Sequence, residues 1–478
     1  MKTKQTGNAA VAGVGYTIGN ILIRGISFIT LPIFTGLMST EAYGLYSTFV
    51  SYESIITLVI SLGLHASLKA AKVEYKEKLN EYVSSIMVLP MLFTLVSLFA
   101  IIPLRNVLTG FLGYGFLWIV LMVVQAWGSS VITMYNCRIS LDFAYKKYLL
   151  LSLVNSVSNV VLSLLLVTTV CKDNTFAGRA IGTSVPPVIV AIVLCGCFFK
   201  KAKVVKNKQY IKFGLSYSLP LIPHGVSQLI LSQFGKIIIQ KKVGNAAAGL
   251  YGFAYTIALI PQIVVSSLDT AWGPWFFEKY EKGNIEEIRT RTVQYVALFS
   301  AFAGGMFCVA PEIVKLMSIA EPAYWEAVGI VAPAILGIYF TFLYTLPAQI
   351  EHYYKKTKYI AIGTVAAAIL NVVANYICVP MYGYEAAVYV TVVTYILYFV
   401  FHILIAWRIT KKNLPFSVMK ICGYGLCVCG MCFVVQMFLD SWLIRYLVAG
   451  AWCVGIALIN KRALMGEIHK LCSGRRVN

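Results

Sequence analysis

Two residues of opposite charge, Arg24 and Glu53, each lie in the middle of a long apolar segment. The segments, residues 12–36 and 42–65, are each close to the ~20 residues that a helix needs to cross a bilayer. A short polar turn at 39–41 joins them, so we expect an antiparallel helical hairpin with both charges near the membrane midplane, counting ~1.5 Å per residue. A charge at that depth is costly and faces a bundle interior or an aqueous cavity. Two interpretations stay open: an ion pair that locks two helices, or a polar transport pathway.

Further polar residues recur at a spacing that places them on one face of a helix. Asn20 precedes Arg24 by four residues, and His224 precedes Gln228 by four, so each pair shares a face. Arginine offers phosphate groups a planar fork of donors, and lysine offers a point charge. An anion crossing the membrane would therefore meet complementary groups along these faces. The predicted substrate-binding residues are Asn20, Arg24, Glu53, Arg179, His224, Gln228 and Lys236.

Three acidic residues in or beside apolar segments are candidates for ion coupling: Glu53, Asp269 and Glu351. A carboxylate in such a position can take up a proton or bind sodium. For Asp269 and Glu351, solvation at a helix end explains an acidic residue equally well. The sequence predicts no cofactor and leaves open coupling to a proton or sodium gradient.

The composition is that of an integral membrane protein. The chain has 478 residues, of which 59% are hydrophobic and 12% are charged, with a mean hydropathy of +0.77. A soluble domain carries about 25% charged residues. The net charge of +21 does not indicate nucleic-acid binding, because the basic residues lie in short loops between apolar segments, as the positive-inside rule expects.

No set of catalytic or metal-binding residues stands out in the sequence. The twelve cysteines lie mostly within or beside apolar stretches, where cysteine behaves as a small hydrophobic residue. The closely spaced Cys427, Cys429 and Cys432 have no neighbouring histidine or carboxylate. A Walker sequence is absent, so ATP hydrolysis is not predicted. We therefore expect a protein without metal and without enzymatic activity.

Hydropathy predicts an all-α, polytopic membrane protein with about fourteen spans. The segment at 269–290 is ambiguous, and Trp272, Trp275 and Phe276 indicate an interfacial position for it. The expected spans are 12–36, 42–65, 81–103, 110–134, 148–170, 177–199, 213–238, 246–268, 290–310, 325–349, 358–380, 384–407, 417–438 and 441–460.

The distribution of lysine and arginine predicts the orientation. With the N-terminus in the cytoplasm, the inner segments hold 31 of these residues and the outer segments hold seven. Because cytoplasmic loops carry the excess of positive charge, this asymmetry places both termini in the cytoplasm. The expected location is the bacterial cytoplasmic (inner) membrane.

The chain also repeats itself. Shifting residues 27–66 by 205 positions aligns Gly44-Leu45-Tyr46 with Gly249-Leu250-Tyr251. Asn155 and Asn159 in the fifth span correspond in spacing to Asn371 and Asn375 in the eleventh. Parallel repeats of this kind place a substrate between two halves near the midplane. The predicted domains are an N-lobe at 1–205 with helices one to six, a C-lobe at 206–410 with helices seven to twelve, and two additional helices with a basic cytoplasmic tail at 411–478.

These features together resemble the multidrug/oligosaccharidyl-lipid/polysaccharide flippase superfamily, and within it the polysaccharide-type flippases. The resemblance spans nearly the whole chain and rests on two motifs: Tyr16-Thr17-Ile18-Gly19-Asn20 followed by Glu41-Ala42-Tyr43-Gly44-Leu45-Tyr46, and Asn371-Val372-Val373-Ala374-Asn375 followed by Val379-Pro380-Met381-Tyr382-Gly383-Tyr384.

The resemblance implies two six-helix lobes in a pseudo-twofold arrangement around a central cavity, with alternating access. It implies that the protein translocates an undecaprenyl-pyrophosphate-linked oligosaccharide and contacts membrane lipids. It also implies a polysaccharide polymerase and chain-length machinery as protein partners. The resemblance also implies a basic residue in the first helix, and Arg24 matches this pattern. Glu53 keeps a drug/cation antiporter of the same superfamily as an alternative, and a lipid II flippase is another. A membrane glycan polymerase or ligase is the alternative from a different class.

Overall fold

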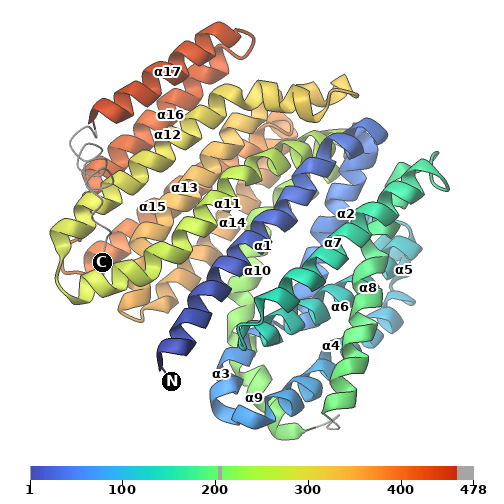
Figure 1. Cartoon of the computed structure of the whole chain (residues 1–478). Coiled ribbons are helices and arrows are strands. Elements are labelled where there is room, and N and C mark those ends of the chain that lie inside the picture. Colours follow the sequence, from blue (N-terminus) through green and yellow to red (C-terminus); the bar gives the residue numbers. More distant parts are fainter. Residues whose placement is uncertain (1, 203–206, 460–478) are drawn as a thin grey trace. The chain divides into compact units, whose positions relative to one another are not determined.

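The structure is a computed structural model that describes residues 2–202 and 207–459, with the side chains of 2–14, 24, 201, 270 and 271 left out. The described residues are almost entirely helical (Figure 1). The predicted tail beyond residue 460 and part of the predicted inner segment at 200–212 lie outside the described residues.

The chain divides into two compact units, Met1–Gly249 and Leu250–Asn478, described separately below as unit 1 and unit 2. Unit 1 includes two helices that sequence analysis assigns to the second lobe, so the predicted lobe boundary at 205/206 stays a prediction. Its helices are α1 (Lys2–Leu37), α2 (Thr40–Ser61), α3 (Leu68–Tyr75), α4 (Leu79–Ile101), α5 (Arg105–Leu112), α6 (Phe116–Ser140), α7 (Tyr145–Thr168), α8 (Thr175–Lys201), α9 (Lys208–Ser218) and α10 (Ile222–Lys242).

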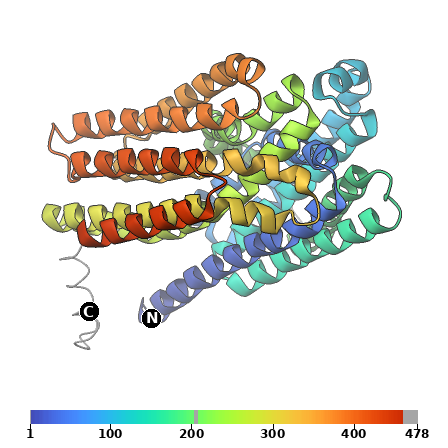
Figure 2. The ribbon, with the colours of Figure 1, turned by 90° about the horizontal axis from the view of Figure 1, so that it is seen from above.

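Unit 2 is a bundle in which α13 packs along α15, and α12 packs against α13, α16 and α17. Figure 2 shows α16 and α17, in orange-red and red, running alongside α12. Its helices are α11, which begins within unit 1 (Asn245–Glu281), α12 (Ile285–Met317), α13 (Val328–Tyr353), α14 (Thr357–Tyr382), α15 (Ala386–Ile409), α16 (Val418–Met437) and α17 (Trp442–Ile459).

Fourteen of the described helices have 18 residues or more, which confirms the expected fourteen-helix architecture. Twelve segments are also apolar enough to be candidate spans by composition. The two long helices outside that set are α2 and α10, in which polar residues make up a larger share than in the others. These two helices belong to the segments in which sequence analysis places most of the predicted binding residues.

Local sequence explains where the helices differ from the expected spans. The expected span at 213–238 is divided into α9 and α10 by a short 3₁₀ turn at Leu219–Leu221, because Pro220 lacks the N–H that would continue the α-helical hydrogen bonds. Gly113 ends α5 in the left-handed region at φ 76°, a conformation that glycine adopts without steric cost. The fourth expected span therefore begins at Phe116 rather than at residue 110.

The segment at 269–290, for which an interfacial position is expected, forms the end of α11 and the start of α12. Trp272, Trp275 and Phe276 lie in the continuous helix α11, which runs to Glu281. Trp272 and Phe276 are buried within unit 2, at 7% and 0% exposure. Phe276 stacks on Phe416 in the core of unit 2, so these aromatic residues pack the bundle, and the interfacial position of the segment stays a prediction.

The first two helices follow each other directly but have different main packing partners. Met38 and Ser39 connect them, and the Ser39 hydroxyl accepts a hydrogen bond from the Ala42 N–H to cap α2. Helix α1 packs along α7, whereas α2 packs against α6 and α10. Equal depth along the expected hairpin is therefore not sufficient to bring Arg24 and Glu53 into contact.

Two glycines that correspond under the 205-residue shift approach each other within unit 1. A Cβ atom on Gly44 would lie 1.8 Å from the carbonyl oxygen of Asn245, and one on Gly249 would lie 1.9 Å from that of Thr40. The first turn of α11 therefore contacts the first turns of α2 backbone to backbone. Only glycine permits such an approach.

Changing Gly44 or Gly249 to alanine is expected to destabilise the protein by about 1–3 kcal/mol or more, the usual effect of overpacking. Thermal unfolding of the purified variants measures the change. Gly25→Ala is the matched control, because a Cβ at Gly25 meets no atom within 4 Å. Equal thermal stability of Gly44→Ala and Gly25→Ala would contradict the close approach.

Candidate functional site

The polar helices α2 and α10 pack against each other within unit 1. The buried Ser51 hydroxyl on α2 donates a hydrogen bond of 2.9 Å to the side-chain carbonyl of Gln233 on α10. Two turns further along α2, Leu58 lies near Gly225 of α10. Two helices that carry polar side chains thus satisfy part of their hydrogen bonding through each other, as polar residues inside a membrane protein require.

Glu53 is buried in α2, at 6% exposure. Its Oε1 accepts hydrogen bonds from Thr57 on the same helix (2.9 Å) and from Ser129 on α6 (2.8 Å). A buried carboxylate is tolerated when hydrogen-bond donors compensate for lost water. Glu53 therefore has two neutral partners, and sequence reasoning did not identify Ser129 because it lies 76 residues away.

Tyr114 joins the neighbouring end of α2 to α10. Its hydroxyl shares a 2.6 Å hydrogen bond with Thr48, donates to the carbonyl of Leu45 (2.7 Å) and accepts from Gln240 (3.2 Å). Burial raises the pKa of Tyr114 to about 12, so the hydroxyl keeps its proton at neutral pH. The phenol thereby fixes the relative position of the two polar helices.

Arg179 near the start of α8 lies among residues from three other helices, which we call the arginine cradle: Phe34 of α1, Tyr46 of α2 and Asn159 of α7. Its guanidinium carbon is 3.6 Å from the centroid of the Phe34 ring and 4.8 Å from that of Tyr46. Asn159 Oδ1 accepts a long hydrogen bond of 3.4 Å from Nη1. Phe34 itself is 2% exposed, so one aromatic ring of the cradle is almost inaccessible to solvent.

The guanidinium of Arg179 keeps donor capacity. Its Nε is buried without a hydrogen-bond partner in the part of the chain that the structure describes, and no ion pair between described residues includes Arg179. Aromatic faces attract a cation without using its N–H groups. The cradle can therefore hold the guanidinium plane while the donors at its edge bind an anion.

The remaining residues predicted for substrate binding in unit 1 are placed less specifically. Asn20 is exposed, and its Oδ1 accepts a 2.6 Å hydrogen bond from the hydroxyl of Tyr148 on α7. His224, Gln228 and Lys236 are half-buried on α10. Arg24 lies in the helical part of α1, and its side chain is outside the described residues. The roles of these residues stay predictions.

The two acidic candidates in unit 2 lie in different surroundings. Asp269 on α11 is half-buried and accepts a 3.3 Å hydrogen bond from Gln349 on α13. Glu351 on α13 is fully buried and pairs with His402 on α15. Solvation at a helix end is therefore the wrong explanation for Glu351. Sequence reasoning missed His402, since a single histidine in an apolar helix gives no signal of a partner 51 residues away.

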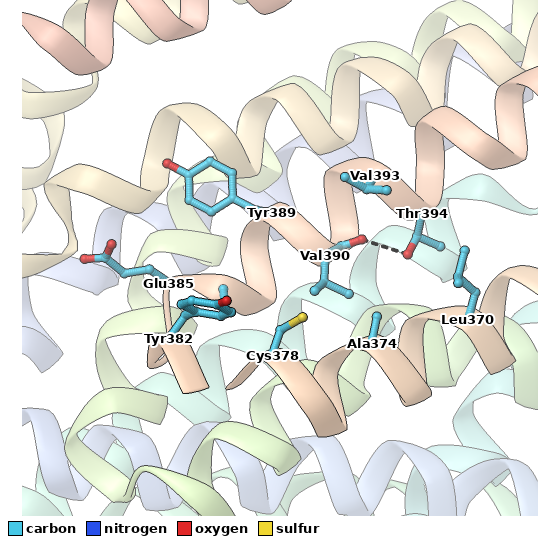
Figure 3. A pocket seen from close by; sticks show the side chains of 10 residues that line it. Leu370, Ala374, Cys378, Tyr382, Glu385, Tyr389, Val390, Val393 and Thr394 are labelled. Carbon is cyan, nitrogen blue, oxygen red and sulfur yellow. Dashed lines mark hydrogen bonds between the residues drawn. The ribbon is translucent and has the colours of Figure 1, made fainter. Parts of the chain in front are cut away.

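A separate groove of about 490 Å³ lies between α14 and α15 (Figure 3). Its lining is mostly apolar, and Glu385 is its one charged residue. The hydroxyl of Thr394 is satisfied by the carbonyl of Val390 at 2.7 Å. None of the residues predicted for substrate binding or ion coupling lines this groove, so the polar candidates of unit 1 are the better site.

Comparisons with known proteins connect these features to a family. Residues 11–279, more than half of the chain, match the model of a family described as polysaccharide biosynthesis protein. The chain is 21% identical over 388 residues to Lsg locus putative protein 1 of Haemophilus influenzae, which covers 75% of this chain and 88% of that protein.

Solved structures share the fold. The lipid II flippase MurJ in an inward closed conformation superimposes with a TM-score of 0.73 at 14% identity, covering 94% of this chain and 99% of that one. An inward-facing multidrug resistance transporter of the MATE family gives a TM-score of 0.64 at 16% identity, covering 84% of this chain and all of that one. The family match confirms the resemblance to polysaccharide proteins that the motifs predict, and the solved structures share the fold: the protein belongs to the polysaccharide biosynthesis protein family and has the fold seen in the lipid II flippase and the multidrug resistance transporter to which it is similar.

Proposed function

We propose that the protein moves a polyprenyl-pyrophosphate-linked oligosaccharide from the cytoplasmic to the outer leaflet of the bacterial cytoplasmic membrane, by alternating access and without catalysis. The arginine cradle is the main observation that supports this proposal. In it, aromatic rings hold the Arg179 guanidinium, and its N–H donors can bind an anion. A pyrophosphate needs such a partner inside a membrane, where charge interactions are strong. The family match supports surface polysaccharide synthesis as the process.

The polar pair α2–α10 supports the same proposal. A sugar chain carries many hydroxyl groups, which lose their water on entering a membrane protein and need hydrogen-bonding replacements. The half-buried His224 and Gln228 on α10 offer such groups beside α2. The excess of inner positive charge supports cytoplasmic termini. A polymerase and chain-length machinery are the partners that would consume the translocated product.

A second candidate, a drug/cation antiporter, is favoured by one observation. Glu53 is a buried acidic group on the polar helix α2, and an organic cation would be attracted to it. The arginine cradle favours the opposite charge on the substrate. The two functions therefore differ in the sign of the charge that the protein binds.

Native mass spectrometry of the purified protein tests the proposal. The ligands are a polyprenyl pyrophosphate carrying a neutral disaccharide, the corresponding monophosphate, lipid II, and tetraphenylphosphonium as a lipophilic cation. We expect the pyrophosphate disaccharide to bind more tightly than the monophosphate, and the cation not to bind. Binding of the cation alone would support the antiporter instead, and binding of lipid II alone would support a lipid II flippase.

A further inference from the structure

The helices α13 and α15 enclose a carboxylate–imidazole pair in unit 2. Glu351 and His402 each have 0% side-chain exposure, and Oε1 of Glu351 lies 2.5 Å from Nδ1 of His402. Such a distance requires a proton between the two atoms. The pair is the one fully buried contact between ionisable groups of opposite type among the ion pairs between described residues.

The two outer atoms of the pair are unsatisfied. Oε2 of Glu351 and Nε2 of His402 are buried and have no hydrogen-bond partner among the described residues. A buried polar atom without a partner is unfavourable by about 1–3 kcal/mol. Unsatisfied buried groups are rare in native structures and call for a functional explanation.

The groups around the pair are mostly aromatic. Tyr344 on α13 stacks over the His402 ring at 5.6 Å, and Tyr398 on α15 meets it edge to face at 4.5 Å. The Tyr398 hydroxyl is bonded to Thr364 on α14 at 2.8 Å. These contacts fix the imidazole ring without supplying a charge.

Other titratable groups meet α13 beside the pair or further along it. Asp269 on α11 bonds to Gln349, two residues before Glu351, and interacts with His352, the next residue after it. Tyr295 on α12 packs on Phe342. Among the ion pairs between described residues, neither Glu351 nor Asp269 is paired with a lysine or an arginine.

Three ionisable groups of α16 lie far from the pair. Tyr424, Cys427 and Cys429 are close to Tyr339, which precedes Glu351 by about three helical turns. Gly425 of the same helix faces Leu343 and Phe340. The described contacts of the pair are therefore those between its own two members and those with the rings of Tyr344 and Tyr398.

Proton counting shows why neither charge state is fully satisfied. With a carboxylate and a neutral imidazole protonated at Nδ1, the pair carries a net charge of −1 in a dry environment. Binding of one proton makes the pair neutral overall, either as carboxylate with imidazolium or as carboxylic acid with neutral imidazole. The loaded pair then places an N–H at Nε2, where the described residues supply no acceptor.

We propose that Glu351 and His402 form a proton-binding site that takes up one proton while the pair is buried and releases it to water during transport. The proton comes from water and returns to water, so no other reactant is involved. Sodium is a poor alternative, because hard cations prefer oxygen ligands and one side of this site is an imidazole nitrogen. The coupling to transport, but not proton binding itself, rests on the proposed function.

Nuclear magnetic resonance of the purified full chain with ¹⁵N-labelled histidine tests proton binding directly. The chain has five histidines, so His402→Gln identifies the signals of that residue. We expect the ¹⁵N signals of the His402 ring to report gain and loss of a proton as the pH is varied, together with an infrared carboxyl band that Glu351→Gln removes. Glu351→Gln should change the pH dependence of the His402 signals, whereas the control His352→Gln should leave it unchanged.

The wild-type titration keeps the proposal falsifiable even if a variant fails to fold. If the His402 signals do not change with pH and no Glu351 carboxyl band appears, the pair is purely structural. Adding the polyprenyl pyrophosphate disaccharide tests coupling, which predicts a shifted midpoint. Binding of this lipid without a shift would overturn the coupling, whereas failure of the lipid to bind would overturn the proposed function and leave the proton site standing.

Discussion

Replacing Arg179 with alanine is expected to weaken binding of a polyprenyl pyrophosphate lipid by about 10-fold to 100-fold, the usual effect of losing charge-assisted hydrogen bonds. The guanidinium is held against Phe34 and Tyr46, and its Nε has no described partner. Its donors are therefore available in advance, so binding need not break an internal ion pair. Native mass spectrometry and glycan export in a deletion strain are the two measurements.

Two further variants separate charge from shape in the cradle. Arg179→Lys keeps the charge but loses the planar fork and its stacking, so we expect intermediate affinity. Arg179→Met keeps an apolar stem between the rings, so the helices should stay packed while the anion is lost. Lys172→Ala, at an exposed position shortly before α8, is the matched control for a nearby positive charge.

The competing explanation of the cradle is that it only joins four helices. In that case Arg179→Met should bind lipid as the wild type does, and Arg179→Ala should lose thermal stability and binding together. Equal stability of the wild type and Arg179→Met, combined with a large loss of affinity in the latter, would show that Arg179 binds the anion and does not only join the helices.

The helices could be predicted from the sequence because bilayer thickness sets their length and their apolar composition. Even α2 and α10 were expected, although they are more polar than the other spans. The errors came from local backbone chemistry: Pro220 divides one expected span, and Gly113 delays the start of another. Hydropathy averaged over a window does not register a single residue that changes hydrogen bonding.

The candidate site was predictable only in part. Arg179 and Glu351 were identified as ionisable residues near apolar segments, which is a property of one position in the chain. Their partners Phe34, Tyr46 and His402 come from other helices and look like ordinary apolar or aromatic positions. Contacts between residues far apart in sequence depend on helix rotation, which periodicity alone does not fix.

Arg24 is the second residue whose replacement is expected to have a large effect. If Arg24 binds the negatively charged pyrophosphate of the substrate, Arg24→Ala should nearly abolish glycan export at equal membrane abundance. Arg24→Lys should keep partial function, because the charge stays while the bidentate fork is lost. Arg24→Glu should be worse than alanine through repulsion of the pyrophosphate. Normal export by both Arg24→Ala and Arg24→Glu would contradict charge recognition at this position.

The double change Arg24→Leu with Glu53→Leu distinguishes substrate recognition from a structural ion pair. Removing one member of a buried pair leaves an unpaired charge, which is destabilising by about 3–5 kcal/mol, and removing both relieves that strain. A structural pair therefore predicts that the double variant recovers export relative to either single variant. Substrate recognition by Arg24 predicts a double variant that inserts normally and remains inactive.

The hydrogen bonds of Glu53 favour the second outcome. Thr57 and Ser129 both donate to its carboxylate, so Glu53 has neutral partners that remain when Arg24 is removed. Helix α1 also packs mainly against α7, whereas α2 packs against α6 and α10. Glu53→Gln is the matched variant, because its amide oxygen can still accept from Thr57 and Ser129. We expect Glu53→Gln to keep wild-type thermal stability, and recovery of export by the double leucine variant would instead assign Arg24 and Glu53 to helix packing.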